Sequence, residues 1–527
     1  KQSVKAVVYK LDDTVVLAMV RGDHEVNEVK LQNIYGAINV DMASEEDLER
    51  CGLTAGYISP IGLKKVKNFD IICDKTVMEM QDACCGANEK DKHYIHVNPA
   101  RDFGDVKVDT IRQIQEGDVC PHCGGKHFTQ ETDTLDGWFD SGSTHAAVLD
   151  ERPELRFPAD MYMEGGDQFR GWFQSSLLTS VAAKGCAPYK SVLCHGWVVD
   201  EQGKQMHKSA GNGVEPSEII KDYGADIIRL WVASSDYTVD VRAGKNIFKQ
   251  LSEAYRKIRN TARFILGNLD GFDPNTDCVA DDQLQDIDRW ALAALDDLIV
   301  NTNAGYAVYD FNKVYHAVYN FCVVAMSNFY LDVTKDRLYC TNGAARKAAQ
   351  TTMYKILVAL DKIIAPILCF TSQEIWDFMP KTEGMNKYVV FEDMPKAGQY
   401  AADDAFKAKW AQLIAVRDEV KKVLEQARAE KIIGASLEAA VTLYCNDAVY
   451  DLLNSIPMDE LADLMIVSHV ELVKGEGGAA SAVEGLGIAA AHATGDKCER
   501  CWKYSADIGT HAAHPTLCAR CASVVEA

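Results

Sequence analysis

The chain has 527 residues, which is enough for three or four domains at roughly 150 residues each. Hydrophobic residues at 47% and charged residues at 25% are ordinary globular usage and exclude wholesale disorder. The net charge of −22 excludes a generally basic nucleic-acid coat, so any nucleic-acid partner must be held by local basic faces.

Two further features of the composition restrict where the chain works. The best candidate for a membrane span, 356–370, is interrupted by Asp361 and Lys362, so we expect no membrane protein. Of the 17 cysteines, six form Cys-x-x-Cys pairs, which favours zinc binding in a reducing compartment, the cytoplasm, over a secreted disulfide framework.

The predicted elements change character along the chain. Strands at 4–9, 14–20 and 66–73 with a helix at 44–50 indicate an α+β domain. Between 128 and 241, a strand at 191–199 precedes a helix at 217–234, which suits an α/β sheet. Apolar residues at three- and four-residue steps from Ile247 to Ile265 then predict a long amphipathic helix, and helical periodicity continues over 286–330 and 345–379.

The last part of the chain mixes element types. A helix is predicted at 406–429 and a strand at 439–444, and the small-residue stretch 475–487 is interpreted as a flexible linker. We therefore expect the cysteine-bearing tail from Lys497 to be a separate module.

That tail carries a predicted metal site. Cys498 and Cys501 are separated by 16 residues from Cys518 and Cys521, a spacing typical of a closed, structural four-thiolate zinc site. His511 and His514 are not needed as ligands. The pair Cys120 and Cys123 has no partner pair, and we interpret it as half of a zinc knuckle that has lost its other half.

The central segment contains four motifs within a stretch of about 75 residues: 136–142, 164–172, 195–199 and 205–209. The polar cluster Glu164, Asp167 and Gln168 suits an ammonium group and ribose hydroxyls, and the glycine-rich loop with Lys204 and Lys208 suits phosphates. Taken singly, each motif is more often a surface turn or a satisfied core residue.

In this order the motifs resemble the second half of the catalytic domain of class I isoleucyl-tRNA synthetases. Residues 205–209 resemble that family's Lys-Met-Ser-Lys-Ser loop, with Gln205 and His207 as departures, and the resemblance continues to about residue 527. It implies that Lys208 stabilises the leaving pyrophosphate. It also implies an ATP and adenylate site made of Glu164, Asp167, Gln168, Trp172, His195, Gly196, Met206, Lys208 and Ser209.

Residues 1–119 resemble a different family, the editing domain of bacterial prolyl-tRNA synthetases. The motifs are Lys30, the loop Gly56–Pro60, Asp74, 86–88, His93 and 98–102. The resemblance implies hydrolysis of mischarged tRNA, with Lys30 holding the terminal phosphate and His93, Asp74 and the loop Gly56–Pro60 positioning the aminoacyl group.

The two resemblances predict a multidomain α/β and α chain. The expected domains are an α+β editing domain (1–119), half of a class I Rossmann-like catalytic domain (120–245), a helical anticodon-binding domain (246–405), an α+β junction domain (406–486) and a zinc-ribbon tail (487–527). None of the 13 histidines lies in a His-x-Gly-His motif, and the chain begins at Lys1. We therefore expect a chimaeric or truncated chain.

The function implied is that of an isoleucyl-type ligase with an editing deacylase domain. The parent family uses tRNA, isoleucine and ATP with Mg²⁺, and we expect a monomer that binds one structural Zn²⁺ and neither DNA nor membrane. On the predicted helix from Ile247, Arg256, Arg259 and Arg263 form a stripe suited to tRNA phosphates, or else a solvated face. The alternative function is a non-catalytic tRNA-binding remnant.

Overall fold

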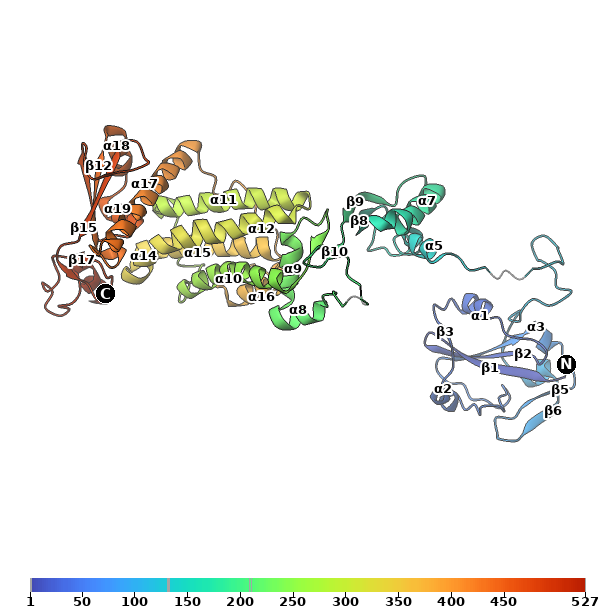
Figure 1. Ribbon diagram of the computed structural model, residues 1–527. Coiled ribbons are helices and arrows are strands. Elements are labelled where there is room, and N and C mark those ends of the chain that lie inside the picture. The colour runs from blue at the N-terminus through green and yellow to red at the C-terminus, as the bar shows by residue number, and fades with distance from the viewer. Residues whose placement is uncertain (1, 130–132, 208, 210, 527) are drawn as a thin grey trace. The chain divides into compact units, whose positions relative to one another are not determined.

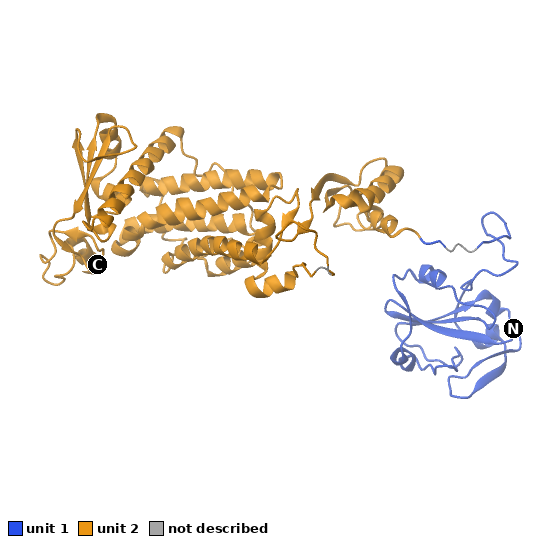
Figure 2. Cartoon of the chain, viewed as in Figure 1, with its two compact units in different colours: residues 1–134 blue, residues 135–527 orange. Residues whose placement is uncertain are grey.

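The computed structural model describes residues 2–129, 133–207, 209 and 211–526, which divide into two compact units, 1–134 and 135–527 (Figures 1 and 2). None of the helices in this described part has the length and apolar character needed to cross a bilayer.

The first unit is built on a mixed five-stranded sheet with strand order β3-β1-β2-β4-β7. Its strands are β1 (Val4–Leu11), β2 (Thr14–Arg21), β3 (Val40–Met42), β4 (Phe69–Asp74) and β7 (Lys107–Asp109). A hairpin and four short helices complete the unit: β5 (Ala83–Gly86), β6 (His93–Val97), α1 (Glu28–Tyr35), α2 (Glu45–Arg50), α3 (Lys75–Met78) and α4 (Pro99–Asp102). This confirms the predicted α+β character.

Strand β2 explains why this sheet has a core on each face. Successive side chains of a strand point to opposite faces of the sheet. Because the apolar run of β2 is continuous, it supplies apolar side chains to both faces. Leu17 belongs to one hydrophobic cluster, and Val16 and Ala18 belong to the other.

The second unit begins with an α/β segment. Its elements are α5 (Gly137–Gly142), α6 (Thr144–Ala147), β8 (Ala159–Gly165), the 3₁₀ helix η1 (Gly166–Arg170), α7 (Trp172–Lys184), β9 (Tyr189–His195), β10 (Val198–Val199), α8 (Pro216–Tyr223), α9 (Ala225–Ser234) and β11 (Val241–Arg242). The single helix predicted at 217–234 is two helices, because Gly224 adopts φ +89° between α8 and α9.

A bundle of mostly long helices then contributes to the largest hydrophobic core, which continues into the C-terminal helices and sheet (Figure 1). They are α10 (Lys245–Asn268), α11 (Asp286–Ala307), α12 (Phe311–Asn320), the π-helix η4 (Phe321–Tyr330), α13 (Leu331–Val333), α14 (Lys335–Cys340), α15 (Gly343–Ile364) and α16 (Cys369–Phe378), with short 3₁₀ turns η3 (Asp281–Gln283) and η5 (Val389–Phe391). The predicted helical character from Ile247 is confirmed.

The chain ends with a four-stranded sheet and a small module that carries the four tail cysteines. These contain α17 (Asp404–Ala429), η6 (Ser436–Glu438), β12 (Ala439–Cys445), α18 (Asp447–Asn454), α19 (Met458–Met465), β13 (His469–Lys474), β14 (Ala479–Ala480), β15 (Leu486–His492), β16 (Asp496–Lys497), β17 (Tyr504–Ser505) and α20 (Ala519–Glu526).

The linker prediction for 475–487 is wrong. The sheet order is β13-β12-β15-β14, and β14 lies inside the supposed linker and pairs with β15. Gly487 lies so close to the loop that leads into β14 that a Cβ would be 1.9 Å from the Gly477 carbonyl oxygen. The glycines therefore permit close backbone packing, and the predicted domain boundary at 486/487 falls within β15.

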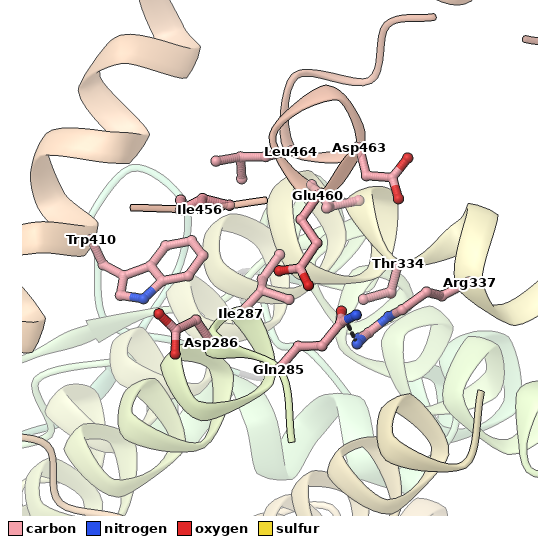
Figure 3. A pocket seen from close by; sticks show the side chains of 11 residues that line it. Gln285, Asp286, Ile287, Thr334, Arg337, Trp410, Ile456, Glu460, Asp463 and Leu464 are labelled. Carbon is pink, nitrogen blue, oxygen red and sulfur yellow. Dashed lines mark hydrogen bonds between the residues drawn. The ribbon is translucent and has the colours of Figure 1, made fainter. Parts of the chain in front are cut away.

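A buried ion network holds three segments of the helical bundle together. The Arg337 guanidinium on α14 donates to both Asp288 oxygens, at 2.5 and 2.8 Å, and the Tyr330 hydroxyl donates to the same carboxylate at 2.7 Å. Arg337 also donates to Gln285, and these two side chains line a small pocket together with Trp410 of α17 and residues of α19 (Figure 3). Three helical segments thus share one buried charge pair.

Candidate functional sites

The carboxyl ends of two parallel strands bring the central motifs together. β8 and β9 are in register, so that Glu164 lies beside Cys194 and Gly165 beside His195. A Cβ on Gly165 would lie 2.7 Å from Asp167 Oδ1 and 3.5 Å from His195 Cε1, so these two side chains flank the glycine. Ligands of open α/β sheets bind at this strand end.

Hydrogen bonds fix the turn between β8 and α7. Gln168 donates from Nε2 to Asp167 Oδ2 at 3.0 Å and accepts from the Trp172 backbone N–H at 3.0 Å. The Trp172 ring stacks on Tyr162 with centroids 4.3 Å apart, and its indole N–H donates to the Ser141 carbonyl. The predicted polar cluster and Trp172 therefore lie together.

Gly196 is required by a close backbone approach. A Cβ there would lie 2.3 Å from the Val239 carbonyl carbon, and the Gly196 N–H donates to the Tyr237 carbonyl at 2.8 Å. Beyond it, β10 pairs in parallel with β11. This contact places the segment 234–242 against the end of β9.

The loop that follows is closed by Asp200 and Asn212, and no motif in the sequence indicates this contact. Asp200 Oδ1 accepts from the backbone of Lys204, and Oδ2 accepts from Asn212 Nδ2 at 2.8 Å. The hydrogen bond from Asn212 is the main reason that the pKa of Asp200 lies below its ordinary value. Met206 packs against the large helical core, and Ser209 is exposed. Lys208 lies outside the described residues.

In the first unit, the loop Gly56–Pro60 docks on the β5–β6 hairpin. Asn88 accepts from the Ser59 N–H at 2.9 Å and donates to the Ser59 carbonyl at 2.8 Å. His93, exposed at the start of β6, lies with its ring edge to face with Tyr57 at 5.5 Å. The geometry thus brings His93 next to the predicted loop.

Asp74 and Lys30 form a separate group. Asp74 is fully buried and accepts from the backbone N–H groups of Thr76, Ile111 and Arg112, so its carboxylate holds backbone instead of facing a ligand. Lys30 Nζ donates to the Arg112 carbonyl at 2.9 Å. The Arg112 guanidinium in turn lowers the pKa of Asp118.

The arginine stripe on α10 differs from the prediction at its middle position. Arg259 Nη2 contacts both Glu374 oxygens, at 2.7 and 2.9 Å, whereas Arg256 and Arg263 are exposed. Lys249 is also exposed and lies seven residues before Arg256, so Lys249, Arg256 and Arg263 follow one line along the helix. Within the described residues, none of these three makes an ion pair.

The four tail cysteines form a site that fits zinc. All four are buried, and their ligand atoms lie within 4.8 Å of one another. Tetrahedral Zn–S bonds of about 2.3 Å separate sulfurs by about 3.8 Å, and Cys501 Sγ is 3.8 Å from Cys518 Sγ. In the described part of the chain no other three potential ligands gather in this way, and Cys120 and Cys123 form a turn only.

The zinc module is not a free tail. Cys340 of α14 belongs to the same buried cluster as the four cysteines. Arg520 contacts the Asp336 carboxylate at 2.5 and 2.8 Å, and the Tyr504 N–H donates to Ser468 Oγ. No sequence signal marks these partners, which are up to 184 residues apart.

Four family models match the chain, and two of the matches overlap over residues 60–103. They describe an aminoacyl-tRNA editing domain (residues 1–103), tRNA synthetases class I (I, L, M and V) (60–244), an anticodon-binding domain of tRNA ligase (288–443) and a zinc finger found in FPG and IleRS (495–524). They support the resemblances inferred from the motifs.

The curated relatives are isoleucine–tRNA ligases. That of Syntrophotalea carbinolica is 52% identical over 415 residues, 78% of this chain and 44% of that protein. Those of Desulfitobacterium hafniense and Moorella thermoacetica are 48% and 46% identical, and cover 86% and 87% of this chain and 48% of each relative. The chain spans about half the length of the curated relatives it matches.

Proposed function

Because the chain is, over most of its length, a relative of the class I isoleucine–tRNA ligases, we propose that it binds tRNA. The observation that carries this is the anticodon-binding match at 288–443, which runs from α11 to β12. Helix α10 precedes this match and packs against α15 and α16, which lie within it. We assign phosphate contacts to Lys249, Arg256 and Arg263, since a chain of net charge −22 needs local cations to hold a polyanion.

Fluorescence anisotropy with a labelled isoleucine tRNA tests this function. We expect saturable binding by the chain alone, with an affinity that falls as salt rises because phosphate contacts release counterions. A chain that binds this tRNA no better than a DNA duplex of the same length would refute the assignment.

We also propose that the first unit deacylates mischarged tRNA. The observation favouring this is the docking of the loop Gly56–Pro60 beside His93, within the editing-domain match. His93 positions the aminoacyl ester and Lys30 holds the terminal phosphate, while Asp74 acts indirectly by fixing the backbone of residues 111 and 112.

The deacylation assay uses alanyl-tRNA for proline, with release of alanine as the readout. His93→Ala should lower the rate at least tenfold, whereas His96→Ala, on the same strand and also exposed, should not. No release by the unmodified chain would favour the alternative function, a non-catalytic tRNA-binding protein.

For the ligase reaction, we assign the ATP and adenylate contacts to the polar cluster at the end of β8 and to the loop 200–212. Glu164, Asp167 and Gln168 face the adenylate, and Lys208 neutralises charge on the departing pyrophosphate. In the parent family, the substrates of this site are isoleucine and ATP with Mg²⁺. This chain has no His-x-Gly-His motif, so we expect it not to complete activation by itself, and we expect it to be a cytoplasmic monomer.

A further inference from the structure

The end of β5 lies directly against the loop Gly56–Pro60 of the first unit. At Gly86, the last residue of β5, the two backbones touch. A Cβ at this position would lie 2.1 Å from the Tyr57 carbonyl carbon and 2.5 Å from the Ile58 nitrogen. Any side chain at residue 86 would therefore displace the loop.

Two residues further on, Asn88 holds the same loop with its side chain and its backbone. Its Oδ1 accepts from the Ser59 N–H at 2.9 Å, and its Nδ2 donates to the carbonyls of Ser59 and Ile61 at 2.8 and 3.4 Å. The Asn88 N–H donates to the Tyr57 carbonyl at 2.7 Å, and the Asn88 carbonyl accepts from the Thr54 hydroxyl at 2.8 Å. One residue thus makes five hydrogen bonds to a segment that lies 27–34 residues earlier in the chain.

The conformation of Asn88 explains why an asparagine suits this position. Its φ of +54° lies in the left-handed region, which asparagine adopts more readily than most residues that carry a side chain. A glycine would also accept this conformation, but it would lose the three side-chain hydrogen bonds. An aspartate has no amide donor, so it would place a carboxylate against the carbonyls of Ser59 and Ile61. Asparagine therefore combines the required backbone conformation with the donor and acceptor that the loop needs.

The loop that Asn88 holds also contacts the histidine of the proposed deacylase site. The Tyr57 ring lies edge to face with His93 at 5.5 Å, and the Tyr57 hydroxyl donates to Asp91 Oδ1 at 2.6 Å. A misplacement of about 1 Å among groups that orient a substrate can lower a reaction rate by about 100-fold. We propose that Asn88 is a positioning residue of the deacylase reaction, which holds the loop Gly56–Pro60 in the place relative to His93 that the aminoacyl ester requires. This rests on the proposed deacylase function and adds a residue that sets its rate.

The test measures steady-state release of alanine from alanyl-tRNA for proline by the full chain. Asn88→Gly should lower kcat about tenfold or more and change KM less than about threefold, because the loop orients the ester while tRNA contacts elsewhere remain. Asn88→Asp, which repels two carbonyls of the loop, should lower kcat to a similar extent. The Ser59 amide should exchange its hydrogen faster in Asn88→Gly, since its acceptor is removed.

Asp12 supplies a matched control in the same unit. It also has a positive φ, of +48°, and its carboxylate accepts from the backbone N–H groups of Ile38 and Asn39 at 3.0 and 2.9 Å. Asp12→Gly therefore loosens a different loop in the same manner. It should lower the unfolding temperature of the unit and leave kcat and KM unchanged.

Circular dichroism identifies which variants are folded, and Asn88→Asp, of nearly the same shape as the parent residue, replaces Asn88→Gly if the glycine variant does not fold. Parent kcat in a folded Asn88 variant, or an equal loss of kcat in Asp12→Gly, would overturn the proposal. Alanine release by the parent chain together with either result would refute this inference alone. No release by the parent chain would refute the proposed deacylase function and this inference with it.

Discussion

The exposed cations of α10 allow a quantitative test of how this acidic chain holds tRNA. The perturbation is the double substitution Arg256→Gln and Arg263→Gln, which removes two exposed charges from one line of the helix. Each lost phosphate contact flattens the dependence of log K on log salt by about 0.7–0.9, so two contacts flatten it by about 1.4–1.8. Between 50 and 200 mM salt, the affinity difference between parent and variant should therefore shrink by about tenfold.

Arg259→Gln is the control that the structure supplies. Arg259 lies on the same helix and carries the same charge, but it is paired with Glu374. The side chains of Arg259 and Glu374 are 40% and 49% exposed, so this ion pair contributes about 0–1 kcal/mol to stability. Loss of the pair should therefore not unfold the bundle. We expect a salt slope close to that of the parent.

The assay is tRNA anisotropy at four or more salt concentrations, with far-UV circular dichroism as a check on helix content. Gln is nearly as good a helix former as Arg, so the helical signal should not change. The reasoning fails if the double variant keeps the parent slope, or if Arg259→Gln flattens it as much as the double variant does.

Three further outcomes are expected. Cys518→Ser should reduce zinc from one per chain to none and speed amide exchange in α14, since Cys340 shares the cysteine cluster; retained zinc would contradict the site. Burial raises the pKa of Asp361 from 3.8 to about 8, so the folded chain keeps a proton that the unfolded chain releases between these values, and stability falls as pH rises. Asp361→Asn should remove this pH dependence, so the free energy of unfolding of the variant relative to the parent should rise by about 2–3 kcal/mol from pH 5.5 to 7.5 in urea unfolding. A difference between variant and parent that does not change with pH would be inconsistent with a buried proton. Isoleucine-dependent exchange between pyrophosphate and ATP should be undetectable with this chain alone, because it has no His-x-Gly-His motif. An exchange signal that Lys208→Ala abolishes would show that the chain activates isoleucine by itself.

Local patterns predicted most of the elements. The continuous apolar run of β2 indicates a strand buried on both faces, and the periodicity from Ile247 indicates α10, because both signals are contained in neighbouring residues. The spacing of the four tail cysteines predicts their cluster for the same reason: each Cys-x-x-Cys turn sets two sulfurs locally.

What could not be predicted depends on residues far apart in sequence. Arg259 looks like any exposed helix cation until Glu374, 115 residues later, is placed beside it. Glycine and alanine in 475–487 have the composition of a linker, and only the pairing of β14 with β15 shows that small residues serve close strand packing there. Composition cannot distinguish these two uses of glycine.

The same distant contacts give the zinc module a role beyond its own stability. Asp336 and Arg337 are neighbours on α14, and each faces a different partner: Asp336 holds Arg520 of the zinc module, and Arg337 holds Asp288 of α11. Cys340, one turn further, packs into the cysteine cluster itself. A short helix therefore couples the metal site to a buried charge pair of the bundle, and removal of one member of such a pair is strongly destabilising. Metal binding by the four cysteines can thus order the end of the helical bundle, because α14 contacts both the zinc module and α11.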